Sequence, residues 1–255
     1  MTTNLIPLWT IISKEVTRIF RIWTQSLIPP ILTSVLFILI FGYSLGSQIS
    51  TLAGVSYIEF IVPGLVMMGV IMSAYTSTSL SLFIQKFQGS IQELLVSPIS
   101  YWQIIFGITF GALIRAILVG LGIFLISVLL TPITLHNIFV ILYFIIMTSL
   151  LFAFAGIITA LWANNFDQIN IFSTFLITPL TYLGGVFYYI NLLPPIWQAA
   201  AKLNPILYMI DGFRYGFLGI HDVPLLTSFL VIFVLTLSFF LVSVYLFKRG
   251  YNLRS

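Results

Sequence analysis

The chain has 255 residues, of which 60% are hydrophobic and 6% are charged, and its net charge is +4. Soluble domains carry about a quarter charged residues, so this chain has too few charges to keep its apolar surface in water. The composition therefore indicates an integral membrane protein, which we expect to form one domain over residues 1–255. No basic cluster suggests a nucleic-acid partner, and the absence of cysteine excludes disulfides and thiol chemistry.

The first segment with a clear pattern is amphipathic and covers residues 8–24. Apolar residues such as Trp9 and Ile19 share one face at helical spacing, and the opposite face carries Lys14, Arg18 and Arg21. A basic face opposite an apolar one is typical of a helix that lies in the membrane interface. The alternative is an ordinary helix start whose charges remain in water.

Six apolar segments follow, each long enough to cross a hydrocarbon core of about 30 Å at about 1.5 Å per residue. The predicted spans are 27–45, 58–84, 104–130, 138–162, 169–189 and 225–247. The stretch 190–224 is apolar but interrupted by prolines and glycines, so we expect short external re-entrant helices whose irregular backbone is covered by protein. The predicted fold is an all-α polytopic membrane protein.

The distribution of Lys and Arg predicts the orientation of the chain. The N-terminal segment, the turn between the second and third spans and the C-terminal end carry seven of these residues, and the opposite side carries Lys202 and Arg214. Positive residues are enriched in cytoplasmic segments of membrane proteins. We therefore expect both termini in the cytoplasm and the stretch 190–224 outside.

The turn between the second and third spans, residues 85–102, is longer than a simple reversal needs. Ile91, Leu94 and Leu95 fall at positions i, i+3 and i+4, which predicts a short helix with an apolar stripe. One interpretation is an interfacial helix that rests on lipid headgroups. The other is a helix that docks on a partner.

The ends of this short helix also have recognisable signals. Gly89 precedes it, and Ser90 stands three residues before Glu93, which is the spacing of a capping box. Pro98 disfavours helical geometry in the residue before it, Ser97. We expect Ser90 to cap the helix and Pro98 to end it.

Two spans carry small or polar residues that suit helix packing. Gly107 and Gly111 form a small-xxx-small pair that lets another helix approach closely. The lower half of the second span is rich in hydroxyls, namely Ser73, Thr76, Ser77, Thr78, Ser79 and Ser81. Hydrogen bonding between helices is the favoured interpretation of these hydroxyls, and the lining of a polar path is the alternative.

Arg115 is a charge near the middle of the third span, where it needs a partner or water. Glu59 or the carbonyls of a neighbouring helix could supply a structural partner, and an anionic substrate or a cavity could supply a functional one. Glu59 lies near the outer boundary, just before a predicted break at Pro63 and Gly64. Asp211 and Arg214 stand at i and i+3, so we expect them to pair with each other.

Three stretches together resemble the permeases of type-2 ATP-binding-cassette exporters. They are Gly89 with residues 93–100, residues 60–68 around Pro63 and Gly64, and residues 203–214 with Asn204, Pro205, Asp211 and Arg214. They occur in the order and at the spacing of that family, so the resemblance covers nearly the whole chain. It is nearest to the short permeases of the bacterial inner membrane.

The resemblance implies a mechanism and a set of partners. The chain would work as two copies in the membrane lipid, each with a separate cytoplasmic ATPase that binds ATP and magnesium. The helix 8–24 would touch the ATPase, and the segment 85–102 would enter a cleft in it. The residues of that coupling segment are Gly89, Ile91, Glu93, Leu94, Leu95, Ser97 and Pro98. The substrates of such exporters include drugs, lipids and glycans on lipid carriers.

No enzymatic constellation stands out in the chain. The phosphate-binding motif G-x-x-x-x-G-K-[ST] is absent, and no spacing of acids with His136 and His221 suggests a metal site. A secondary transporter is a rival interpretation, but it would need ionisable residues at mid-membrane in repeated halves, where only Arg115 is found. A membrane scaffold that transports nothing is the second rival.

Overall fold

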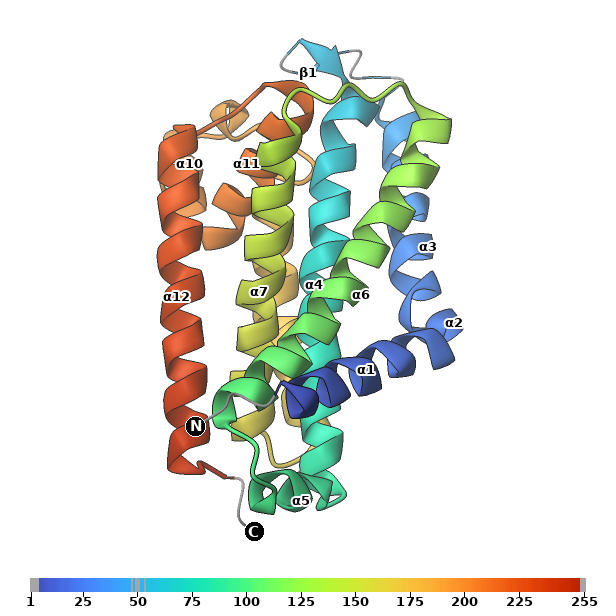
Figure 1. Cartoon of the computed structure of the whole chain (residues 1–255). Coiled ribbons are helices and arrows are strands. Elements are labelled where there is room, and N and C mark those ends of the chain that lie inside the picture. Colours follow the sequence, from blue (N-terminus) through green and yellow to red (C-terminus); the bar gives the residue numbers. More distant parts are fainter. Residues whose placement is uncertain (1–4, 47, 49–50, 53, 253–255) are drawn as a thin grey trace.

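The computed structural model describes residues 5–46, 48, 51–52 and 54–252 of the chain as a bundle of long helices (Figure 1). The first helix, α1 (Ile6–Arg21), lies across the bundle near one of its ends. The chain then runs through α2 (Trp23–Ser26), α3 (Ile28–Phe37) and a π-helical turn, η1 (Ile38–Tyr43). These three form one apolar passage over Trp23–Tyr43.

The middle of the chain supplies three long helices and the short helix between two of them. The strands β1 (Thr51–Leu52) and β2 (Val55–Ser56) pair antiparallel, with Thr51 opposite Ser56, and lead into α4 (Tyr57–Phe87). The helices α5 (Ser90–Val96), α6 (Tyr101–Leu130) and α7 (Ile138–Trp162) follow.

The last third of the chain is more broken. A helical run consists of α8 (Phe166–Phe172), the π-helical η2 (Ser173–Ile177) and α9 (Thr178–Tyr182). The 3₁₀ turn η3 (Ile190–Leu192) and the helices α10 (Pro195–Lys202) and α11 (Pro205–Leu218) come next. The chain then runs back along the bundle in α12 (Leu225–Arg249).

The structure confirms an all-α, polytopic chain and corrects one of the predicted spans. Five helical passages in the described part are long and apolar enough to cross a membrane: Trp23–Tyr43, α4, α6, α7 and α12. The predicted span 169–189 is instead the helical run 166–182, which ends at Tyr182. Gly185 has a positive φ of 80°, which turns the chain out of the helix soon afterwards.

The centre of the bundle is α4, which packs chiefly against α7 and α6. In its most apolar window 78% of the residues are buried, against 17% in α12. Close packing explains part of this, because a Cβ atom on Gly156 of α7 would lie 2.6 Å from the carbonyl oxygen of Tyr75. Burial on most sides is expected of a largely apolar helix at the centre of a bundle.

Hydrogen bonds near the end of α4 show which parts of the chain lie at the same end of the bundle. Lys86, next to the end of α4, donates to the carbonyl oxygens of Leu161 and Ala163 at 3.1 and 2.7 Å, and Asn252 donates to Leu161 at 3.0 Å. The C-terminal end of the described chain therefore lies at the end that carries α5, here called the α5 end, and Figure 1 shows the N-terminal end near it. The strand pair and α10 lie at the opposite end, here called the α10 end.

Candidate functional site

The helix α5 projects from the α5 end of the bundle and is attached to it by one apolar side. Ile91 is 2% exposed and belongs to a cluster with Phe83 and Ile104, and Leu94 and Leu95 are half-buried against the same cluster. The other side of the helix is open, with Glu93 exposed and Val96 88% exposed. The sequence thus forms a docked helix whose outer face is exposed.

The cap of α5 differs from the predicted one. Gly89 occupies the N-cap position with φ of 73°, and Ser90 is already the first helical residue, so its hydroxyl donates back to the Gln85 carbonyl at 3.3 Å. The left-handed glycine reverses the chain between α4 and α5, which leaves Ser90 unable to cap. The predicted capping box with Glu93 is therefore wrong, and the C-terminal cap is Ser97, which donates to the Leu94 carbonyl at 2.7 Å before Pro98.

A capping box does occur one turn later, at the start of α6. Ser100 accepts the backbone N–H of Gln103 at 3.4 Å, and the Gln103 side chain accepts the N–H of Ser100 at 3.0 Å. These reciprocal bonds satisfy two donors that a helix start leaves free. They fix the point at which the chain leaves the α5 segment and enters α6.

The small-residue pair of α6 meets α1. A Cβ atom on Gly107 would lie 2.5 Å from Ile11, and one on Gly111 would lie 2.5 Å from the Cβ of Glu15. Real side-chain atoms do not approach that closely, so α1 can cross α6 here only because both positions are glycine. The prediction that Gly107 and Gly111 admit another helix is confirmed, and the partner is α1.

Glu15 is a buried carboxylate at this crossing, with 2% of its side chain exposed. It accepts a hydrogen bond from Arg18 at 2.6 Å and one from the Ser81 hydroxyl of α4 at 2.8 Å. Arg18 also donates to the Ser77 carbonyl at 3.3 Å. Two residues of α1 therefore hold the hydroxyl-rich part of α4.

The basic face of α1 is only partly where the sequence placed it. Lys14 and Arg21 are exposed, but Arg18 turns inward because the Glu15 carboxylate and a backbone carbonyl of α4 attract it. Lys14 borders a groove of about 300 Å³ between α1 and α5, lined also by Leu94 and Ile99.

Sequence reasoning missed Glu15, although a signal was present. Ile11, Glu15 and Ile19 are spaced by four residues and so share one face of a helix. The structure buries all three. An acid at the centre of the packing face of a helix is a candidate for a buried polar contact.

Two of the six hydroxyls predicted in α4 bond to another helix, as the favoured interpretation expected, whereas those of Ser73 and Ser79 are buried without a hydrogen-bond partner. Thr78 donates to the Ala153 carbonyl of α7 at 2.9 Å, and Ser81 donates to Glu15. Thr76 donates to the Met72 carbonyl of its own helix at 2.7 Å.

Arg115 contacts a backbone carbonyl, one of the two structural partners that the sequence left open. It donates to the Ser26 carbonyl of α2 at 3.1 Å. Glu59 lies in the first turn of α4, at the α10 end, and is not the partner. The predicted break at Pro63 and Gly64 does not occur, because α4 continues through both residues and Gly64 lies against Val186.

Arg214 lies at the α10 end, contacts several segments of the chain and is 1% exposed. Its guanidinium donates to the Gly185 carbonyl at 2.5 Å and lies 3.9 Å from the ring centroid of Phe60 in α4. One of its nitrogens is 4.0 Å from the Asp222 carboxylate, which itself is 1% exposed. Three segments that are distant in the sequence therefore meet at one side chain.

Asp211 does not form the predicted ion pair with Arg214. Its carboxylate accepts the backbone N–H groups of Asp222 and Val223 at 2.7 and 3.2 Å. The left-handed Gly219, with φ of 72°, turns the chain after α11 and brings Asp222 to Arg214 instead. Burial raises the pKa of Asp222 to about 6, and the negative charge of Asp211 adds to that rise.

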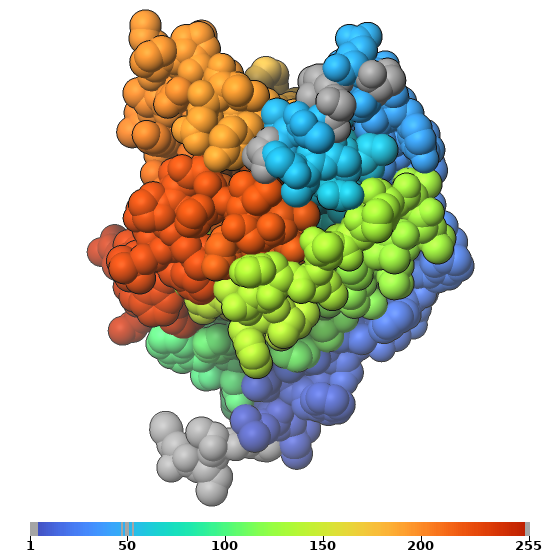
Figure 2. Space-filling model, turned by 90° about the horizontal axis from the view of Figure 1, so that it is seen from above, coloured from blue at the N-terminus to red at the C-terminus, as the bar shows by residue number. Residues whose placement is uncertain are grey.

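The remaining residues predicted for the external segment start α11. Asn204 accepts the N–H of Ile206 at 3.0 Å as the N-cap, and Pro205 is the first helical residue. The amide of Asn204 also donates to the Leu180 carbonyl at 2.6 Å, which ties α11 to α9. Figure 2 looks down on this end, where orange α10 and red-orange α11 lie beside each other.

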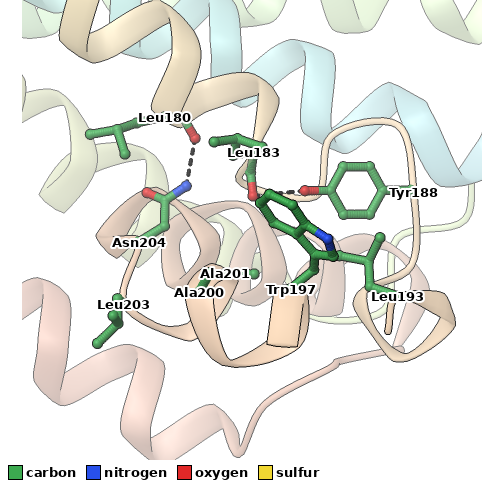
Figure 3. Close-up of a pocket in the computed structure, with 9 residues that line it drawn as sticks. All are labelled: Leu180, Leu183, Tyr188, Leu193, Trp197, Ala200, Ala201, Leu203 and Asn204. Atoms are coloured by element: carbon green, nitrogen blue, oxygen red, sulfur yellow. Dashed lines mark hydrogen bonds between the residues drawn. The ribbon is translucent and has the colours of Figure 1, made fainter. Parts of the chain in front are cut away.

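An apolar cavity of about 400 Å³ opens at the α10 end between α9 and α10. Figure 3 shows Leu180 and Leu183 on one side of it and Trp197 on the other. The hydroxyl of Tyr188 donates to the Leu183 carbonyl at 2.9 Å, and the Asn204 amide is bonded to Leu180, so both polar groups are already paired. The cavity is therefore suited to an apolar group.

Comparison with known proteins gives one consistent family. A family described as ABC-2 type transporter matches residues 7–218. The chain is 47% identical over 250 residues to the inner membrane transport permease YadH of Escherichia coli K12, covering 98% of each. It is 28% identical over 211 residues to nodulation protein J of Rhizobium leguminosarum bv. trifolii, covering 82% of this chain and 80% of that protein. The chain belongs to the ABC-2 type transporter family and resembles its inner-membrane permeases.

Proposed function

We propose that this chain is the membrane subunit of an ATP-driven exporter. Two copies stand together in the bacterial inner membrane, and each binds a separate cytoplasmic ATPase that holds ATP and magnesium. ABC-2 permeases generally pair with an ATPase subunit, which supports this arrangement. Closure of the ATPases around ATP pushes α5, and the packed helices of the bundle move as rigid bodies.

The observation that carries the proposal is the placement of α5. Ile91 anchors the helix, while Glu93 and Val96 point away from the bundle. An exposed helix face at the end of a membrane hairpin is suited to a cleft on a partner. We assign the coupling role to this face, with Gly89 as the hinge before it and Ser97 and Pro98 as its end.

A sixth passage through the membrane supports the proposed orientation. The two described chain ends lie together at the α5 end, which requires an even number of passes. The five long passages therefore need the helical run 166–182 as a sixth. The excess of Lys and Arg at the α5 end favours a cytoplasmic location for it.

The substrate class that fits best has an apolar part. The cavity between α9 and α10 has an apolar lining, and it opens at the end that we assign to the outside. Drugs, lipids and glycans on lipid carriers share this property. The walls of the cavity would receive the apolar part of such a substrate as it leaves the bundle.

The coupling assignment is tested by Glu93→Arg. Glu93 is exposed, so the change should leave the folded permease in the membrane at its normal yield. Removing one partner of a charge pair at a subunit contact costs about 2–5 kcal/mol of binding, which weakens association by at least about 30-fold. Affinity purification of the tagged chain, followed by measurement of the co-purified ATPase, gives the result.

The control is Gln48→Arg, which places the same charge on an exposed residue at the α10 end. It should leave ATPase recovery unchanged. Full ATPase recovery and full transport in Glu93→Arg would show that α5 is only an interfacial turn. Failure of the unaltered chain to recover any ATPase would contradict the exporter proposal itself.

A further inference from the structure

A chain of hydrogen bonds joins α1 to α5 through the end of α4. The Glu15 carboxylate accepts from the Ser81 hydroxyl at 2.8 Å. One turn later, Gln85 donates to both the carbonyl and the hydroxyl of Ser81, each at 3.2 Å. Ser90, the first residue of α5, donates to the Gln85 carbonyl at 3.3 Å. These hydrogen bonds connect α1 to α4 and α4 to α5 through residues that contact one another directly.

The position of Glu15 is fixed from two further sides. The missing side chain of Gly111 lets the Glu15 stem lie directly on α6. Arg18 neutralises the carboxylate and adds its own bond to the Ser77 carbonyl. Glu15, Ser81 and Gln85 are all buried. Arg18, the partner of Glu15, is 31% exposed. Such a pair adds little to stability compared with apolar packing, but it can define one geometry, because a shift of the helices would leave the buried Glu15 charge unpaired.

We propose that Glu15 is a positioning residue for coupling, which makes α1, the last turns of α4 and α5 move as one unit. This inference rests on the proposed function, since the movement comes from the ATPase that pushes α5. Glu15 then carries the push in α5 to the central helix of the bundle and to α1. Without Glu15, α5 and α1 move independently and the push is partly lost.

The test uses the absence of cysteine in the chain. Thr17→Cys in α1 and Gln92→Cys in α5 are exposed positions that take spin labels without entering the network. Pulsed electron paramagnetic resonance on the full permease, with the labelled chain diluted in an excess of unlabelled chain, then reports the distribution of distances between the two helices of one copy. We expect one narrow distribution in the otherwise unaltered chain.

Two variants break the connection in different ways. Glu15→Gln keeps the size of the side chain and removes its charge. Ser81→Ala keeps the Glu15–Arg18 pair and removes the Ser81 hydroxyl, with its bonds to Glu15 in α1 and to Gln85. Both should broaden the distance distribution, while Asp167→Asn, an exposed acid at the same end of the bundle, should not. Narrow distributions in all variants overturn the proposal. The Ser81→Ala variant gives the answer if Glu15→Gln does not fold.

A second measurement separates positioning from a purely structural role. The ATPase that co-purifies with the tagged chain should bind Glu15→Gln and Ser81→Ala as well as it binds the unaltered chain. ATP hydrolysis per assembled complex should change at least about fivefold, the low end of couplings between sites. Unchanged hydrolysis with a normal complex overturns the inference. If the unaltered chain binds no ATPase, the proposed function fails, whereas the distance measurement still decides whether Glu15 joins the helices.

Discussion

At the scale of single residues, two arginines inside the bundle are held by backbone partners that lie far away in the sequence. Arg115 reaches the Ser26 carbonyl and Arg214 reaches the Gly185 carbonyl. An uncompensated charge in a low-dielectric interior is costly, so each of these contacts selects one arrangement of helices. Sequence spacing suggested Asp211 as the partner of Arg214. The carboxylate near Arg214 is instead that of Asp222, which the turn at Gly219 brings there, and a turn of this kind leaves no periodic signal in the sequence.

Asp222 makes the α10 end sensitive to pH. Its pKa is raised from 3.8 to about 6 by burial and by Asp211, so between these values the folded chain holds a proton that the unfolded chain releases. The free energy of unfolding therefore falls as pH rises through this range. A pKa shift of about two units changes the free energy of unfolding by about 3 kcal/mol at most. Thermal unfolding in detergent should occur at a higher temperature at pH 5 than at pH 7.5.

The Asp222→Asn variant has no carboxylate to titrate at this position. Its unfolding temperature should depend less steeply on pH than that of the unaltered chain. The matched control is Asp167→Asn, whose carboxylate is exposed in the first turn of α8, and which should keep the original pH dependence. An undiminished pH dependence in Asp222→Asn would refute the assignment.

At the scale of elements, long apolar helices were easy to predict and buried polar contacts were not. The predicted span 138–162 coincides with α7, and 58–84 lies within α4. Hydrophobicity and length decide such spans. The helical run 166–182 ends earlier than predicted, because Gly185 counts as apolar in a hydrophobicity pattern but turns the chain with a positive φ. Likewise, Glu15 and an exposed acid such as Glu93 look alike until their neighbours are known.

The crossing of α1 and α6 should fail when its glycines are filled. A Cβ at position 111 would lie 2.5 Å from the Cβ of Glu15, so Gly111→Ala forces the two helices apart. Overpacking of this kind costs about 1–3 kcal/mol. We expect α1 to detach more often, which exposes the backbone beside Lys14 and Arg21 to trypsin. The measurement is the rate of cleavage within α1 of the purified protein.

A matched control is Leu125→Ala on the same helix, where the native side chain is 63% exposed. This change removes surface from α6 without touching α1, so cleavage within α1 should keep its original rate. Equal cleavage rates in Gly111→Ala and in the unaltered chain would mean that α1 does not depend on the close approach seen here.

At the scale of the whole molecule, the threading of the chain makes the number of passes testable. Lys86, Ala163 and Asn252 meet at the α5 end, and Asn204 and Leu180 meet at the α10 end. The run 166–182 therefore connects the two ends of the bundle. At about 1.5 Å per residue its 17 residues extend about 25 Å, a length that slight local thinning of the bilayer accommodates.

Single cysteines placed in the cysteine-free chain separate the possible topologies. Gln92→Cys in α5, Asp167→Cys at the start of α8 and Leu203→Cys after α10 are all exposed positions. With six passes and both termini in the cytoplasm, a membrane-impermeant maleimide should label only Leu203→Cys in right-side-out vesicles. All three should react once detergent opens the membrane. Absence of labelling at Leu203→Cys, as at Asp167→Cys, would leave five passes, because the run 166–182 would not cross. Labelling of Gln92→Cys would put α5 outside, beyond the reach of any cytoplasmic ATPase, and the exporter mechanism would fail with it.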